Sequence, residues 1–95
     1  MSATQFSGAE ALTVGSTSVG FSSSNYGQSS FAHLTVEVSD VRMTLNGGDA
    51  TVAAGIPLRP NDEVILESLD EIKRVRFIRD SGTDATVIAH FGSKA

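Results

Sequence analysis

The chain has 95 residues, of which 40% are hydrophobic and 19% charged, and it contains no cysteine. This length fits one domain, because so few residues cannot fill a second hydrophobic core. The net charge of −4 excludes nucleic acid and an anionic membrane as main partners, since both require a basic surface.

A domain of this size buries only roughly 60–65% of the surface that its unfolded chain exposes, so a lone monomer is only marginally stable. Disulfides cannot form without cysteine, and no metal-ligand cluster is visible in the sequence. We therefore expect a homo-oligomer or a larger assembly.

Residues 1–10 are small and polar and show neither a strand period nor a helix period. They also lack the basic start and the apolar stretch of a signal peptide. We predict a flexible N-terminal arm over 1–10, with Phe6 as its anchor on an adjacent subunit, and a single domain over 11–95.

The next segment, Ala11 to Phe21, is rich in Thr and Val and is interrupted by glycines. This composition predicts one or two short strands. Ser22 to Ser30 is polar and predicts a surface loop, in which Tyr26 is the one large side chain available for a contact.

The clearest strand follows from Phe31 to Val38, where apolar and polar residues alternate. Val41 to Leu45 alternates in the same way. Asn46 to Asp49 contains residues that tolerate positive φ, so we predict a tight hairpin with a return strand over Ala50 to Ala53.

Prolines mark the next connection. Ile56 to Leu58 contains Pro57, which predicts a connection or an edge, and Arg59 to Asp62 has the composition of a turn.

Glu63 to Leu69 and Arg74 to Arg79 both resemble strands, and Asp70 to Lys73 between them is suited to one helical turn. The alternative is one helix from Asp62 to Arg79, because several apolar residues there have near-helical spacing. The β-favouring residues after Arg74 make strands the preferred interpretation.

Ser81 to Asp84 predicts a turn and Ala85 to Phe91 a last strand. The result is about seven or eight short strands at spacings of roughly 8–12 residues with turns between them, which is typical of a sandwich or small barrel. We predict an all-β fold, an antiparallel β-sandwich of jelly-roll or immunoglobulin-like type.

The sequence contains no strong signal for a catalytic site or a metal site. His33 and His90 occupy predicted strands and can face one another, but two ligands without a third make a weak metal signal. No serine lies in a nucleophile elbow, and the acidic cluster between Glu63 and Glu71 resembles a solvated face more than a glycosidase pair. We therefore expect no enzyme, no cofactor and no metal.

The most informative local feature is the order of acidic and basic residues along the chain between Asp62 and Arg79. Acidic residues between Asp62 and Glu71 are followed by basic ones between Lys73 and Arg79. Pairing within the sheet is the preferred interpretation, and contact between subunits is the alternative. Arg74 and Arg76 lie opposite Val75 in the predicted strand, which directs them outward as interface candidates.

The order of segments resembles a group of small virion structural proteins of tailed bacteriophages and prophages. The likeness runs from Ala32 to Gly92, about two thirds of the chain, and extends to the strands before it. Its segments are His33 to Glu37, Val41 to Thr51, Gly55 to Asp62, Val64 to Lys73, Val75 to Arg79 and Gly82 to Val87.

The resemblance implies a β-sandwich module in the virion, assembled in the host cytoplasm, that binds the major capsid protein or another virion protein as a decoration, fibre-base or tail-associated component. It brings no catalytic residue. Two alternatives remain: a receptor- or carbohydrate-binding module of a phage fibre, for which aromatic residues are scarce, and a small barrel enzyme of the cupin type, for which a metal triad is missing.

Overall fold

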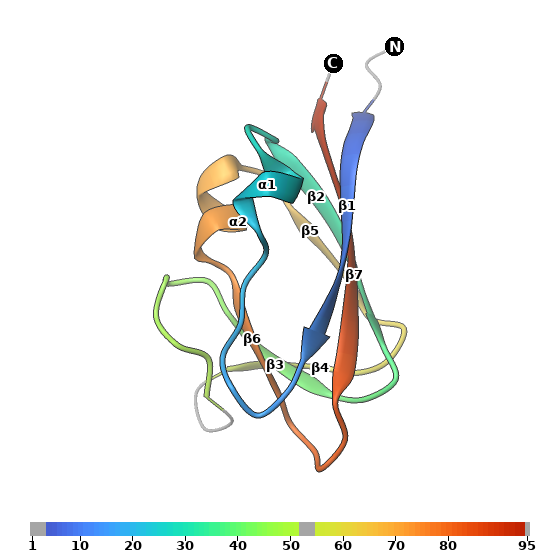
Figure 1. Cartoon of the computed structure of the whole chain (residues 1–95), viewed down its shortest axis with the longest axis vertical. Coiled ribbons are helices and arrows are strands. Elements are labelled where there is room, and N and C mark those ends of the chain that lie inside the picture. The colour runs from blue at the N-terminus through green and yellow to red at the C-terminus, as the bar shows by residue number, and fades with distance from the viewer. Residues whose placement is uncertain (1–3, 52–54, 95) are drawn as a thin grey trace.

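The chain forms seven strands and two short helices in a computed structural model that describes the backbone of residues 4–51 and 55–94 and the side chains of residues 8–51 and 55–93. Figure 1 shows their arrangement. The strands are β1 (Thr4–Val14), β2 (Phe31–Glu37), β3 (Val41–Thr44), β4 (Ile56–Leu58), β5 (Glu63–Leu66), β6 (Arg76–Arg79) and β7 (Ala85–Lys94). The helices are α1 (Ser23–Tyr26) and α2 (Leu69–Arg74).

The strands form two antiparallel sheets. One has four strands in the order β1-β7-β2-β5, and the other has three in the order β4-β3-β6. Every strand pair in both sheets is antiparallel. The predicted all-β sandwich is therefore confirmed, and the two termini lie side by side because β1 and β7 are neighbours (Figure 1).

The core lies between the sheets and follows from the period of two. In β2 the side chains of Ala32, Leu34 and Val36 are buried, whereas those of the alternate residues are not. Phe77 of β6 and Phe91 of β7 are fully buried from opposite sheets. Burial of each large apolar side chain contributes about 1.5–3 kcal/mol to stability.

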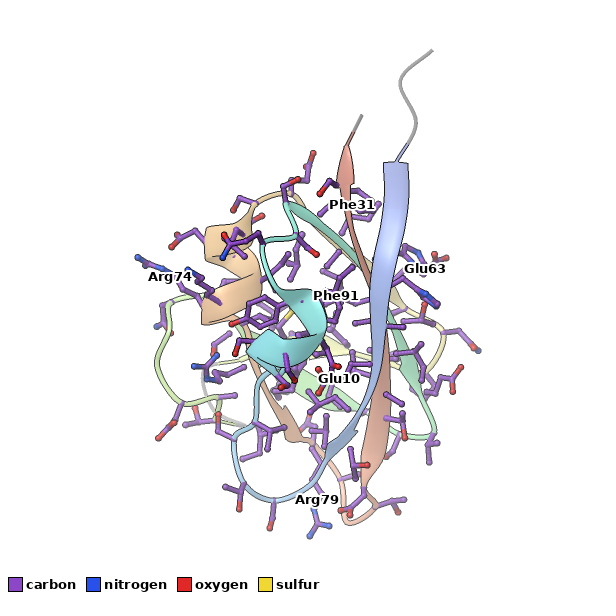
Figure 2. All side chains as sticks on the ribbon, turned by 45° about the horizontal axis from the view of Figure 1, so that its top comes forward. Glu10, Phe31, Glu63, Arg74, Arg79 and Phe91 are labelled. Atoms are coloured by element: carbon purple, nitrogen blue, oxygen red, sulfur yellow. The ribbon has the colours of Figure 1, made fainter. Side chains whose placement is uncertain are left out.

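Phe21 contacts both sheets from the segment between β1 and α1. Its ring lies edge-on to those of Phe77 and Phe91, with centroid distances of 5.5 and 5.3 Å. This edge-to-face geometry is the one that aromatic quadrupoles favour. Phe91 lies in the interior in Figure 2, whereas Glu63 and Arg74 point to opposite sides of the molecule.

Helix α2 confirms the predicted helical turn at Asp70 to Lys73. Its N-cap, Ser68, accepts a hydrogen bond from the amide of Glu71 at 3.1 Å, and the Glu71 carboxylate accepts one from the amide of Glu67 at 2.8 Å. Such caps satisfy amides that have no partner within the helix. The buried Ile72 fixes α2 to the core, and the alternative of one helix from Asp62 to Arg79 is wrong, because strands β5 and β6 flank this turn.

Helix α1 replaces part of the loop predicted at Ser22 to Ser30. The Glu10 carboxylate accepts hydrogen bonds from the Ser22 amide and from Asn25 Nδ2, both at 3.0 Å, and so fixes α1 to β1. A Cβ on Gly8 would lie 2.4 Å from the carbonyl oxygen of Asn25. Only glycine therefore allows α1 to lie this close to β1.

The predicted N-terminal arm is wrong from Thr4 onward. Thr4 to Val14 form one strand paired with β7, and this strand contains one irregularity between Phe6 and Gly8. Most residues between Thr4 and Glu10 are too small and polar to show a hydropathy period. They nevertheless form a strand, because the backbone of the long strand β7 supplies hydrogen-bond partners on both sides of the irregularity. Residues 1–3 lie outside the described part of the chain.

The hairpin predicted at Asn46 to Asp49 is also corrected. The turn exists, since Gly47 has a φ of 83° and the Asn46 side chain accepts a hydrogen bond from the Gly48 amide at 2.9 Å. However, β3 pairs with β4 and β6, not with a return strand at Ala50 to Ala53. Ala50 instead donates its amide to Ser18 Oγ at 2.9 Å, and residues 52 and 53 lie outside the described part.

The two proline predictions are confirmed. Pro57 lies in β4, an edge strand, where a residue without an amide is tolerated. At the turn Arg59 to Asp62, the Asp62 amide donates to the Arg59 carbonyl at 3.0 Å and the Arg59 amide to Asp62 Oδ2 at 2.8 Å.

Candidate protein-binding surface

The outer face of the four-stranded sheet is a regular surface of the described chain. Each strand places alternate residues on this face, because successive side chains of a strand point to opposite sides. The residues on it are Ala9, Ala11 and Thr13 of β1, Thr86, Ile88 and His90 of β7, Phe31, His33, Thr35 and Glu37 of β2, and Glu63 and Ile65 of β5.

Small or apolar side chains dominate this face. Ile65 is 53% exposed, and Ile88 is half-buried. Ala9 and Ala11 are exposed, so the β1 side of the face is shallow. The charged residues Glu37 and Glu63 lie toward one end of their strands, and the Glu63 side chain reaches His33 in the middle of the face.

Two histidines lie side by side across the middle of the face. His33 and His90 are direct cross-strand partners, as predicted. His33 Nε2 lies 2.5 Å from Glu63 Oε1, so its ring is oriented by the neighbouring edge strand. Within residues 4–51 and 55–94, no group of three potential ligands is close enough to hold a metal ion.

Three of the predicted interface residues, Tyr26, Arg74 and Arg76, do not lie on this face. Tyr26 lies on α1, half-buried, with its ring edge-on to Phe91 at a centroid distance of 5.9 Å. It therefore packs on the core. Phe6 lies in β1 opposite Gly92, and its side chain is outside the described part of the chain.

The two arginines predicted to point outward from one strand have different positions. Arg74 is the last residue of α2, is exposed, and pairs with Asp70 at 3.1 Å. Arg76 is half-buried, and its Nη1 donates to the carbonyls of Lys73 and Val75 at 2.9 and 2.8 Å. Arg76 thus satisfies carbonyls at the end of the helix, and it is less available to a partner than we expected.

We predicted that the acidic residues between Asp62 and Glu71 pair with the basic residues between Lys73 and Arg79 across neighbouring strands. This pairing is not found between the strands that the structure describes, although both groups form ion pairs within the chain. Strands β5 and β6 lie in different sheets. Besides the pair within α2, Arg79 pairs with Asp84 at 2.6 Å and Arg42 with Asp80 at 2.8 Å. These pairs lie between β3, β6 and the turn that leads to β7.

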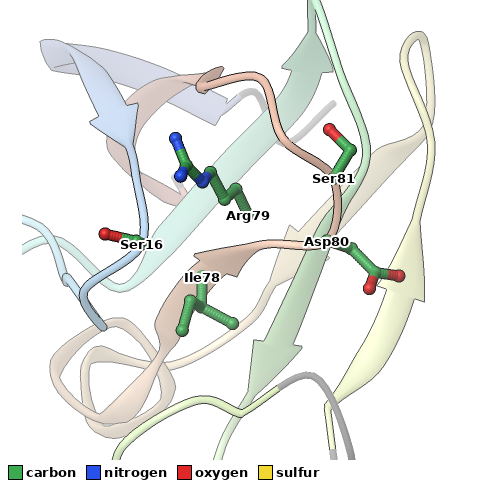
Figure 3. A pocket seen from close by; sticks show the side chains of 5 residues that line it. All are labelled: Ser16, Ile78, Arg79, Asp80 and Ser81. Carbon is green, nitrogen blue, oxygen red and sulfur yellow. The ribbon is translucent and has the colours of Figure 1, made fainter.

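An open hollow of about 300 Å³ lies beside this network, lined by Ser16, Ile78, Arg79, Asp80 and Ser81. Figure 3 shows Ile78 and Arg79 extending to opposite sides of β6. Both charged side chains of the hollow are engaged in the ion pairs named above, so they serve the β6–β7 connection.

Neither protein-family models, nor curated proteins, nor solved structures match this chain. Within the described residues, no helix is long and apolar enough to span a membrane. The geometry of the sandwich and the residues on its surface are therefore the evidence for function.

The contribution of β1 to this surface is not evident from the sequence. The available signal was weak: Leu12 and Val14 alternate with Ala11 and Thr13, but the preceding small residues hide the period. Ile65 was within a predicted strand, yet its exposure follows from its place on the outer face of an edge strand.

Proposed function

We propose that this chain is a structural component of the particle of a tailed bacteriophage. It binds the capsid, as a decoration protein, or the tail surface, and it associates with copies of itself. The module is assembled in the host cytoplasm and acts through its surfaces, without catalysis.

The observation that carries this proposal is the outer face of the four-stranded sheet, with Ile65 exposed at one edge and small side chains at the other. A face that presents exposed apolar side chains beside polar ones suits protein contacts. The resemblance of the segments from Ala32 to Gly92 to small virion proteins supports the choice of partner.

The size of the face supports binding in many copies. Strands lie about 4.8 Å apart and rise about 3.3 Å per residue, so the seven residues of β2 with their neighbours in β1 and β7, together with the four of β5, cover roughly 400 Å². A stable interface buries about 800 Å² on each partner. One face therefore supplies only part of a stable contact, and linked copies on a repeating lattice can supply the rest through avidity.

The first test is whether the chain is in the particle. We expect mass spectrometry of purified particles, from the phage or prophage whose genome encodes it, to detect the chain at a stoichiometry that matches a repeating lattice. Its absence from purified particles would rule the proposal out.

The second test concerns the face itself. Purified chain is added to particles that lack it, and bound protein is measured by co-sedimentation. Ile65→Lys places a charge on the apolar edge and is expected to lower the affinity by about tenfold or more. Thr83→Lys, an exposed change in the turn before β7, is the matched control and is expected to bind as the original chain does.

A glycan array on the same protein separates this proposal from the receptor-binding alternative. We expect no glycan to bind. Specific glycan binding together with no binding to particles would favour a fibre module instead.

A further inference from the structure

Strand β1 is an edge strand, and the direction of its backbone groups can be deduced from the hydrogen bonds on the opposite side of the sheet. The Val36 amide donates to Asp62 and the Val36 carbonyl accepts from Asn61, so both groups of Val36 point toward β5. Backbone groups alternate in direction along a strand. Those of His33 and Thr35 therefore point toward β7.

The same alternation continues across the sheet. Thr35 and His33 lie opposite Ile88 and His90, so these two residues of β7 bond to β2. Val87 and Ala89 then bond to β1, where they lie opposite Leu12 and Glu10.

The backbone groups of Ala9, Ala11 and Thr13 consequently point away from the sheet. Gly15, two residues after Thr13, has its backbone groups on the same side. Its carbonyl accepts a hydrogen bond from the Arg79 amide of the other sheet at 3.0 Å. Among the residues that the structure describes, no such neighbour is found for Ala9, Ala11 and Thr13.

The other three edges are protected. Strand β4 is three residues long and contains Pro57, and β5 is four residues long and begins with the exposed Glu63. The edge of β6 is covered by Val19, which exchanges two backbone hydrogen bonds with Phe77 at 2.8 and 2.9 Å. Short strands, prolines, charges and covering segments are the usual means of blocking edge-to-edge pairing.

Within the described part of the chain, strand β1 has no comparable protection. It is 11 residues long, contains no proline, and has one charged residue, Glu10. That carboxylate turns inward to bind Ser22 and Asn25 of the α1 region. The regular part of the edge runs from Gly8 to Val14, between the irregularity that follows Phe6 and the bond of Gly15 to Arg79.

We infer that β1 pairs antiparallel with β1 of a second copy, about a two-fold axis at Ala11. In this register Ala11 lies opposite its own copy, Ala9 opposite Thr13, and Glu10 opposite Leu12. Ala9, Ala11 and Thr13, whose backbone groups point outward, therefore hydrogen-bond to the same residues of the other copy. The two Glu10 side chains do not lie opposite each other, so their charges are not brought together. The register uses the whole regular segment and joins two four-stranded sheets into one of eight strands.

The partner is a second copy because the segment is complementary to itself. Its middle residue is the small Ala11, the outer side chains are Ala and Thr, and the two-fold register gives every outward amide a carbonyl. The inference deepens the self-association within the proposed function, and it is tested on purified protein alone. Its failure therefore leaves particle binding undecided, and failure of particle binding leaves the dimer undecided.

Cysteine cross-linking tests the register, because the chain has no cysteine of its own. Directly opposed, hydrogen-bonded residues have Cα atoms about 5.5 Å apart, which a disulfide can span. We expect Ala11→Cys to form a disulfide-linked dimer on mild oxidation. Ala9→Cys and Thr13→Cys should cross-link when mixed, and each should cross-link poorly alone.

Thr35→Cys, in the middle of the outer face, reports on pairing face to face, and Thr83→Cys reports on random collision. Both are expected to stay monomeric under the same conditions. Efficient cross-linking of Thr35→Cys without that of Ala11→Cys would overturn the inference in favour of a dimer joined through its faces.

Proline substitution tests the pairing in solution. Ala11→Pro removes an outward amide and no hydrogen bond to β7, so the fold is expected to persist. By analytical ultracentrifugation, we expect the original chain to be a dimer and Ala11→Pro a monomer with an unchanged circular dichroism spectrum. A monomeric original chain, or a dimer that Ala11→Pro leaves intact, would overturn the inference; if this variant unfolds, the cross-linking pattern decides.

Discussion

Gly8 illustrates how one residue decides whether a local element can form. A side chain at this position would meet the carbonyl oxygen of Asn25, which is part of the α1 backbone and cannot rotate away. Glu10, two residues later, bonds to the same turn through Asn25 Nδ2. The fixing of α1 to β1 therefore depends on one small residue and one carboxylate.

From this geometry we expect Gly8→Ala to lower the free energy of unfolding by about 1–3 kcal/mol, the usual cost of overpacking. Gly82→Ala is the control, since a Cβ there meets no atom within 4 Å. It is expected to be neutral or to stabilise by about 0.5 kcal/mol, because alanine restricts the unfolded chain. Urea denaturation of the two variants checks this, and equal stabilities would contradict the close packing of α1 on β1.

Among the strands and helices, those defined by a local sequence pattern were predictable, whereas those that depend on pairing with a distant strand were not. Strand β2 and helix α2 were predictable, since alternation defines the first and a Ser N-cap followed by acidic residues favours the second. Strand β1 was predictable only from Ala11 onward, because the Gly, Ala and Ser residues before it leave no hydropathy period, and its pairing depends on β7, about 80 residues away in sequence.

The same distinction applies to the candidate surface. The sequence indicates that Ile65, His33 and His90 lie in strands, and the prediction that the two histidines face one another is confirmed. It does not indicate which strand lies beside which. Ile65 and Ala9 lie on one face because β1, β7, β2 and β5 are neighbours in this order, and that order arises from long-range pairing.

Helix α2 provides a test at this scale. Ser68 accepts the Glu71 amide, whereas Ser22, the N-cap of α1, makes no side-chain capping bond. We expect Ser68→Ala to lower the free energy of unfolding by about 1 kcal/mol. Ser22→Ala is the matched control, with an expected change below about 0.5 kcal/mol. Equal effects in urea denaturation would show that the cap of α2 is not specific.

For the whole molecule, the two surfaces lie close together but act through different groups. The outer face presents side chains, whereas the β1 edge presents backbone amides and carbonyls. A two-fold pairing at β1 places two outer faces on the same side of one continuous sheet. A dimer therefore offers about twice the area of one face to a lattice, which brings roughly 400 Å² per copy toward the 800 Å² of a stable interface.

This arrangement predicts how the two proposals combine. Once one face of a dimer is bound, the second binds at a high effective concentration, and avidity can exceed the affinity of a single face by about 10²–10⁴. We expect Ala11→Pro to bind particles that lack the chain, but with an affinity lower by about tenfold or more, and Ile65→Lys to weaken binding of dimer and monomer alike. Titration of both variants and the double variant by co-sedimentation separates the effects. If Ala11→Pro binds as tightly as the original chain, the dimer does not contribute to attachment, and the lattice contact must come from single copies.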